Sequence, residues 1–87
     1  MFKQEVALKN ETGLHARPAS LFVKEASRFV SDVKVFKEGK EYNAKSIMGI
    51  LSMGAGKGDK ITIQAEGDDA KEVVEALVKL VNDNFNE

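Results

Sequence analysis

The feature that most constrains this chain is the alternation of apolar and polar residues in every segment that could be a strand. Residues 2–8, 33–37 and 60–66 place apolar side chains mainly at every second position, with polar side chains between them. Such a period of two predicts strands with one buried face and one wet face. The segments therefore predict a sheet that is covered on one side only.

Two longer segments have the period of a helix. Apolar residues recur at spacings of three and four over residues 16–30, and again over residues 69–81. Both patterns predict amphipathic helices. Asp69 and Glu72 form an aspartate-led variant of the capping box, which marks the start of the second helix.

Turn and cap residues order the remaining elements. Glu38 and Gly39 predict a tight turn between the strand at 33–37 and a short strand that follows it, and Ser46 is expected to cap a marginal helix. The complete order is strand, helix, strand, strand, short helix, strand, helix. It predicts an α+β open-faced sandwich over residues 1–87, with a four-stranded, mostly antiparallel sheet and three helices on one face.

Composition narrows the classes of function. The 87 residues carry 13 basic and 14 acidic side chains and no cysteine. With no net positive field, no thiolates and no long apolar run, we expect no nucleic-acid binding, no disulfide, no metal or other cofactor and no membrane span. We expect a cytoplasmic monomer. Its chemistry should lie on the surface, because so small a core leaves no room for a deep pocket.

The only histidine, His15, is the leading candidate for chemistry. Pro18 is tolerated in the first turn of a helix, so His15 is expected at the helix cap or directly before it. The positive end of a helix binds phosphate, and Arg17 can donate to the same oxygens. That end also disfavours imidazolium, which leaves a neutral nucleophile. A surface histidine without a role is the alternative, and the coherent surroundings of His15 argue against it.

Two other segments are less specific. Residues 54–58 are rich in glycine, but Leu51 and Gly58 occupy places where a P-loop needs glycine and serine or threonine, so this stretch is interpreted as a connector. The apolar residues that follow Ser46 are too crowded to bury every face. Either Met48 and Leu51 form an exposed docking patch or the whole group is core, and the sequence does not separate these two readings.

Taken together, these motifs resemble a known family, the histidine-containing phosphocarrier protein HPr of the bacterial phosphoenolpyruvate-dependent sugar phosphotransferase system. The segment from Gly13 to Ala19 resembles the phosphorylation-site signature of the family. The segment from Lys45 to Gly49 resembles its serine-site signature, at the expected spacing. The resemblance covers the whole chain.

The resemblance implies that the protein is a carrier and not an enzyme. His15 would accept a phosphoryl group on Nδ1 from phosphorylated enzyme I and pass it to enzyme IIA domains of sugar permeases, with Arg17 steadying the phosphate. Ser46 would be a regulatory site for an HPr kinase/phosphorylase, and its product would bind a catabolite-control transcription regulator. We expect partners to dock on five residues: Ala16, Ser20, Ile47, Met48 and Leu51.

Two other classes remain open at this point. The chain can be a regulatory paralogue that takes phosphate without serving sugar transport, or an interaction module whose His15 is never modified. Regulatory forms of the family that dispense with transfer often lack the histidine, and this chain keeps it.

Overall fold

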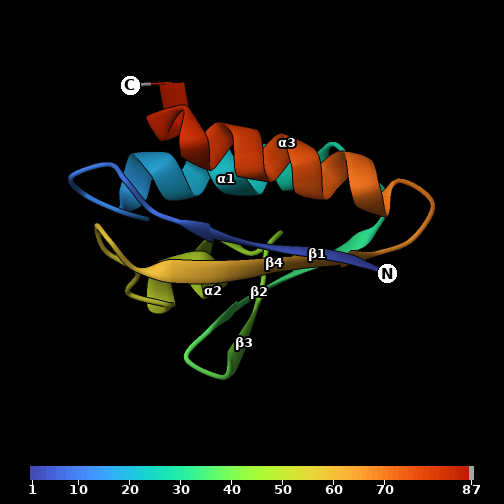
Figure 1. The fold of residues 1–87 in the computed structure, drawn as a ribbon, viewed down its shortest axis with the longest axis horizontal. Coiled ribbons are helices and arrows are strands. Elements are labelled where there is room, and N and C mark those ends of the chain that lie inside the picture. Colours follow the sequence, from blue (N-terminus) through green and yellow to red (C-terminus); the bar gives the residue numbers. More distant parts are fainter. Residues whose placement is uncertain (87) are drawn as a thin grey trace.

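The elements follow the predicted order, and the α+β sandwich is confirmed (Figure 1). The computed structural model describes residues 1–86. Its elements are β1 (Phe2–Ala7), α1 (Ala16–Ser27), β2 (Asp32–Lys37), β3 (Lys40–Asn43), α2 (Ile47–Ser52), β4 (Lys60–Glu66), α3 (Ala70–Asn82) and a short 3-10 turn, η1 (Asn84–Asn86).

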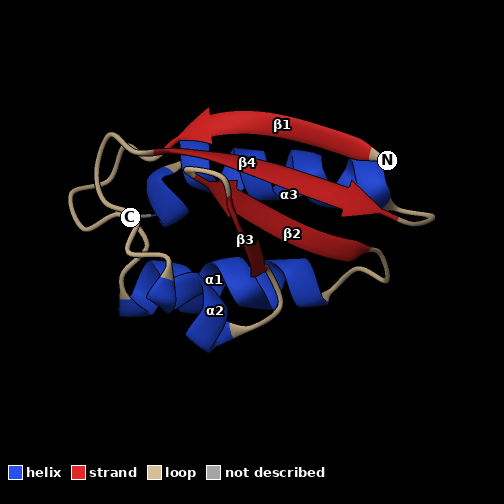
Figure 2. Cartoon of the chain, turned by 90° about the horizontal axis from the view of Figure 1, so that it is seen from below, coloured by secondary structure: helices blue, strands red, loops and turns tan. Residues whose placement is uncertain are grey.

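The four strands form one antiparallel sheet in the order β1-β4-β2-β3. The first strand therefore pairs with the last, and β1 and β3 are the two edges. Figure 1 shows α1 and α3 side by side over one face of the sheet, and in Figure 2 α2 lies beside α1, close to β3. The core fills the space between these layers, and its largest fully buried side chains include Phe22, Ile63, Leu77 and Phe85.

The first helix ends earlier than the apolar pattern predicts. α1 stops at Ser27, and Val30, which the pattern placed on the buried face, is 78% exposed. The backbone N–H groups of Val30 and Ser31 and the Ser31 hydroxyl donate instead to the Asp69 carboxylate. Asp69 precedes α3 but makes no side-chain cap bond to it. A contact between distant segments has replaced the predicted capping box.

The hairpin between β2 and β3 has the predicted two-residue turn. Glu38 and Gly39 have φ angles of 52° and 81°. Two successive positive φ angles are typical of a type I′ turn, whose twist matches that of the flanking strands. Glycine adopts a positive φ without strain, so Glu38 occupies the more strained of the two turn positions.

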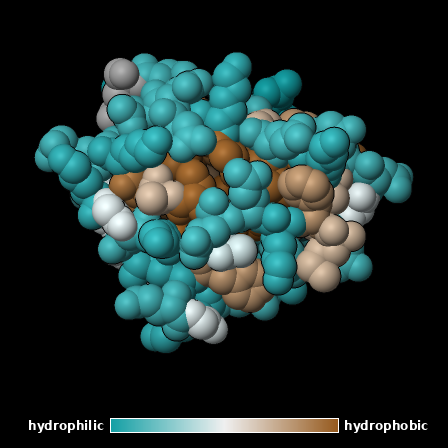
Figure 3. Space-filling view, viewed as in Figure 1, coloured by the Kyte–Doolittle hydropathy of each residue, from teal (hydrophilic) through white to brown (hydrophobic). Residues whose placement is uncertain are grey.

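The face of the molecule drawn in Figure 3 is largely polar. In Figure 3 the hydrophobic colour gathers mainly in a band across the middle of the view, at the level where the helices of Figure 1 meet the sheet. Across residues 1–86, no helix has the length and hydropathy needed to cross a membrane. Over the same residues, no three His, Asp or Glu side chains converge as metal ligands would.

Candidate functional site

His15 is the N-cap residue of α1, one of the two positions that Pro18 allowed. Its backbone is extended, with φ −89° and ψ −170°, and its carbonyl oxygen accepts the Ala19 N–H at 2.8 Å. Its side chain makes no cap bond to the helix and is exposed. The imidazole is therefore held by its backbone alone and is open to an approaching partner.

The first turn of α1 provides donors for an anion beside His15. The N–H groups of the first residues of a helix have no partner within the helix, and Pro18 has no N–H at all. Within residues 1–86, those of Ala16 and Arg17 donate to no acceptor and are left as free donors. The first turn contains no acidic residue, and Arg17, which belongs to it, is exposed. This end of α1 is therefore suited to phosphate.

The loop before His15 rests on the backbone of a distant segment. Gly13 has a φ of 60°, and a Cβ built on it would lie only 2.5 Å from Cα of Gly56 and would also collide with the Ala55 carbonyl oxygen. The Leu14 N–H donates to that same Ala55 oxygen at 2.9 Å, and the Leu14 side chain is buried. A side chain at position 13 would push the loop of His15 away from its support.

Asn10 is a buried residue that forms hydrogen bonds within the same loop. It is only 5% exposed, its Nδ2 donates to the Gly13 carbonyl at 2.9 Å, and its own carbonyl accepts the Gly13 N–H at 3.2 Å. Nδ2 also lies 3.3 Å from Oγ1 of Thr12. Sequence reasoning missed Asn10, although an asparagine at the start of a turn that ends in glycine is typical of side-chain-to-backbone bonding.

The glycine-rich segment at 54–58 is a connector, as predicted, and it supports the His15 loop. Its shape is fixed by Asp59, whose carboxylate accepts the Gly56 N–H at 2.8 Å. Lys57 donates to the Glu11 carboxylate at 2.7 Å, and this contact lowers the pKa of Glu11. The lysine therefore links the connector to the loop at 10–13, although such an exposed ion pair contributes little stability.

Ser46 caps α2, as its position predicted. Its Oγ accepts the Gly49 N–H at 3.1 Å, and its backbone is extended. The preceding residue, Lys45, donates from Nζ to the Phe29 carbonyl at 2.8 Å. The start of α2 is thus joined to the end of α1.

The structure separates the two readings of the apolar cluster in α2. Ile50 is fully buried, whereas Met48 is 72% exposed and Ile47 and Leu51 are 37% and 36% exposed. Ala16 and Ser20, one turn apart on α1, are exposed as well. α1 and α2 pack directly against each other (Figure 2). The five predicted docking residues, Ala16, Ser20, Ile47, Met48 and Leu51, therefore lie on two adjoining helices.

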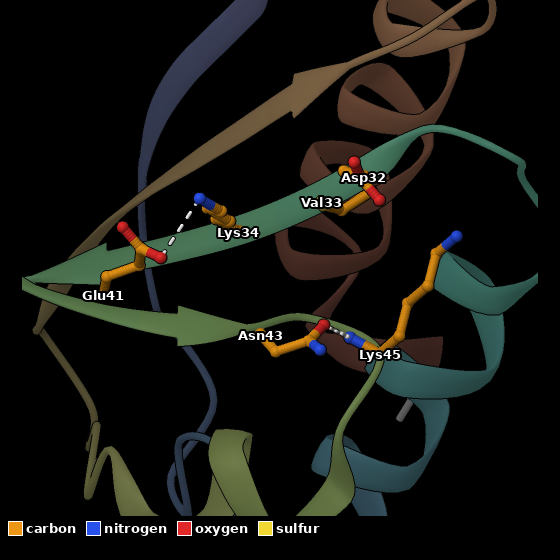
Figure 4. Close-up of a pocket in the computed structure, with 6 residues that line it drawn as sticks. All are labelled: Asp32, Val33, Lys34, Glu41, Asn43 and Lys45. Atoms are coloured by element: carbon orange, nitrogen blue, oxygen red, sulfur yellow. Dashed lines mark hydrogen bonds and ion pairs between the residues drawn. The ribbon is translucent and has the colours of Figure 1, made fainter.

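The candidate site does not coincide with the cleft between β2 and β3. This cleft has a volume of about 260 Å³ (Figure 4). An ion pair of 3.1 Å between Lys34 and Glu41 crosses it, and Asn43 accepts the Lys45 N–H at its rim. None of its lining residues is a predicted site residue, and its volume is below the ~300 to 1,000 Å³ typical of small-molecule sites. His15 itself lies on an exposed part of the surface.

Solved structures of similar proteins have the same fold. HPr-C-His from Thermoanaerobacter tengcongensis is 50% identical, with a TM-score of 0.98 over 100% of this chain and 98% of that one. The phosphocarrier protein HPr from Bacillus anthracis is 51% identical, with a TM-score of 0.89 over 92% and 95% of the two chains.

The expectation of a monomer is corrected by other structures in this comparison. They include an HPr dimer from Thermoanaerobacter tengcongensis, with a TM-score of 0.80 and 50% identity over the full length of both chains. They also include Crh from Bacillus subtilis as a domain-swapped, intertwined dimer, with a TM-score of 0.77 and 48% identity over 97% of each chain. Charge and composition cannot exclude such assembly, because β1 and β3 leave two unpaired sheet edges.

The family is shown by sequence comparison as well. A family model described as the PTS HPr component phosphorylation site matches residues 2–83. The HPr-like protein Crh of Halalkalibacterium halodurans is 49% identical over 93% of this chain and 96% of its own length. With the matching fold and a histidine at the N-cap position of α1, these comparisons show that the chain belongs to the HPr family of phosphocarrier proteins.

Proposed function

We propose that His15 carries phosphoryl groups in the sugar phosphotransferase system, taking them from phosphorylated enzyme I and passing them to enzyme IIA domains. One observation carries the proposal. His15 is an exposed N-cap whose imidazole makes no cap bond, next to the free N–H groups of Ala16 and Arg17. A nucleophile and an anion site therefore share one surface.

The step needs no cofactor from this chain. The lone pair of the His15 Nδ1 attacks phosphorus, a P–N bond forms, and the bond between phosphorus and the donor group breaks and leaves its electron pair with the donor. The N–H groups of Ala16 and Arg17, with the Arg17 guanidinium, stabilise the charge on the phosphoryl oxygens. Transfer to the next protein is the same step with this chain as the donor.

The decisive experiment is incubation with enzyme I and phosphoenolpyruvate, followed by intact mass at neutral and acidic pH. We expect one acid-labile phosphoryl group on the wild-type chain and none on His15→Ala, since this is the only imidazole in the chain. His15→Ala should fold normally because the side chain it removes is exposed. Acid-labile phosphate on that variant would falsify the assignment.

A regulatory role is the second candidate function, and the relatives favour it. One solved structure similar to this chain is described as the catabolite repression HPr, Crh, of Bacillus subtilis. Ser46 is the residue that would receive such a signal, because it is half-buried at the start of α2, directly before the exposed Ile47 and Met48. We infer that phosphorylation of Ser46 regulates the docking of partners on the exposed residues of α1 and α2. Because the chain retains His15, this regulatory role is compatible with the carrier role.

A further inference from the structure

We propose that Asn10 is a positioning residue for His15, and that its side-chain amide holds the loop from which the imidazole is presented. The proposal rests on the proposed carrier function, since it concerns the geometry of the same transfer. It is carried by the burial of Asn10 and by the contacts of its amide with Thr12 and Gly13.

His15 has no other means of being oriented. Its imidazole makes no cap bond, so its place follows from the backbone that leads into α1. Two backbone bonds hold that segment, from the Leu14 N–H to the Ala55 carbonyl and from the Gly13 N–H to the Asn10 backbone carbonyl. The Asn10 side chain adds a third, from Nδ2 to the Gly13 carbonyl. A residue without a side-chain donor at position 10 would keep the two backbone bonds and lose only the Nδ2 bond that closes the loop on the Gly13 carbonyl.

The orientation of the Asn10 amide can be assigned from its contacts. Turning it round would place Oδ1 against the Gly13 carbonyl oxygen, where two acceptors repel each other. In the assigned orientation Oδ1 is buried and has no hydrogen-bond partner within residues 1–86. An unpaired buried acceptor destabilises the fold. We therefore attribute the role of Asn10 to its Nδ2 donor and not to Oδ1.

A positioning residue should affect the rate of transfer and not the docking of the partner. Asn10 is 5% exposed and cannot present a surface to enzyme I, so its loss should leave KM nearly unchanged. A misplacement of about 1 Å at a reacting group can cost about a hundredfold in rate. We expect Asn10→Leu, which keeps the branching of the side chain but is larger and has no donor, to lower kcat for transfer from enzyme I by about ten- to a hundredfold.

Ser31→Ala is the matched control. Ser31 is also buried in a loop and bonded through its side chain, but it follows the opposite end of α1 from His15. Both variants should lose stability, whereas only Asn10→Leu should lose kcat. An equal loss of kcat in both variants, or a loss in Asn10→Leu that lies wholly in KM, would overturn the proposal.

A measurement without partners tests the loop even if no phosphoryl transfer occurs. In the wild-type chain the Asn10 side-chain amide should exchange with solvent more slowly than that of the exposed Asn82. In Asn10→Leu the backbone amides of Gly13 and Leu14 should exchange about tenfold faster, because a loop that opens more often protects them less. Equal exchange of the two side-chain amides would refute the positioning role, whereas a wild-type chain that accepts no phosphate would refute only the carrier function.

Discussion

At the scale of single residues, the site depends on donors that neighbouring side chains leave free. His15 does not cap its own helix through the imidazole, and Pro18 removes one backbone donor from the first turn. In the proposed transfer, the phosphoryl group would be bound by the N–H groups of Ala16 and Arg17 and by the Arg17 guanidinium. This small set makes each donor important.

Arg17→Ala should slow phosphoryl transfer without abolishing it. A hydrogen bond to a charged group contributes about 1.5 to 3 kcal/mol, which corresponds to about a ten- to 150-fold loss of rate. Rapid-quench measurements of transfer from enzyme I would detect this loss. Arg28→Ala is the control, because Arg28 lies at the other end of α1 and pairs with Glu25 at 3.0 Å. Equal rates for Arg17→Ala and the wild-type chain would remove Arg17 from the mechanism.

Asp69 predicts a pH dependence of stability. The Ser31 hydroxyl, with the Val30 and Ser31 N–H groups, lowers the pKa of Asp69 below its ordinary value of 3.8. A carboxyl with a lowered pKa stabilises the folded state fully above its unfolded pKa and loses that contribution as pH falls through the folded pKa. The stability difference between the wild-type chain and Asp69→Asn should therefore be large at pH 7 and shrink below about pH 4.

Chemical denaturation across that pH range measures the difference. Asp68→Asn is the matched control, because Asp68 is the exposed neighbour of Asp69 and makes no side-chain hydrogen bond or ion pair within the described residues. Its stability profile should run parallel to that of the wild-type chain. A difference between the wild-type chain and Asp69→Asn that persists unchanged at pH 3 would show that the carboxylate is not the stabilising form.

At the scale of elements, the periodic patterns predicted what is local and missed what depends on distant segments. The strands, the hairpin turn, the cap at Ser46 and the place of His15 all follow from neighbouring residues. The end of α1 does not follow from neighbouring residues, because the Val30 and Ser31 N–H groups donate to Asp69, which is distant in sequence. The contacts of Asn10 escaped prediction for a related reason: they matter only because Gly13 packs on residues 55–56.

The short helix α2 should respond to charge more than to the loss of its cap. Ser46→Ala removes the bond to the Gly49 N–H, and the loss of such a cap costs about 0.5 to 2 kcal/mol. Ser46→Asp can keep a cap but adds a negative charge beside Ile47 and Met48, where a partner with an acidic surface would be repelled. Transfer from enzyme I to Ser46→Asp should therefore fall at low salt and recover in part as salt rises.

Ser46→Ala provides the comparison, since it alters the cap without adding charge. Its transfer rate should show no recovery with salt beyond that of the wild-type chain. Circular dichroism should give the same fold for all three proteins. A Ser46→Asp rate equal to that of the wild-type chain at every ionic strength would leave Ser46 as a cap alone.

At the scale of the whole molecule, two partners that must both reach one imidazole compete for the same part of the surface. The total accessible area is 4985 Å², and a standard interface covers about 800 Å² per partner. Two partners that must both reach His15 would overlap on the exposed residues of α1 and α2. We therefore expect enzyme I and an enzyme IIA domain to compete for this chain.

Chemical-shift mapping with each partner tests this expectation. Both footprints should include Met48 and Leu51. Met48→Ala should raise the KM of phosphoryl transfer with either partner, because it removes a large exposed contact. Val30→Ala is the control, because Val30 is equally exposed but lies beyond the opposite end of α1 from His15. Two disjoint footprints would contradict a shared docking surface.

The order of the strands also determines when the site can exist during synthesis. The residues from Asn10 to Arg17 leave the ribosome early, but the backbone on which Gly13 rests, at 55–56, follows some forty residues later, and β1 finds its only partner in β4. At a synthesis rate of about 5 to 20 residues per second, several seconds pass in which His15 has left the ribosome and β1 has no partner strand. A ribosome-bound chain that ends before β4 should therefore display His15 to enzyme I without the loop geometry that makes it an acceptor.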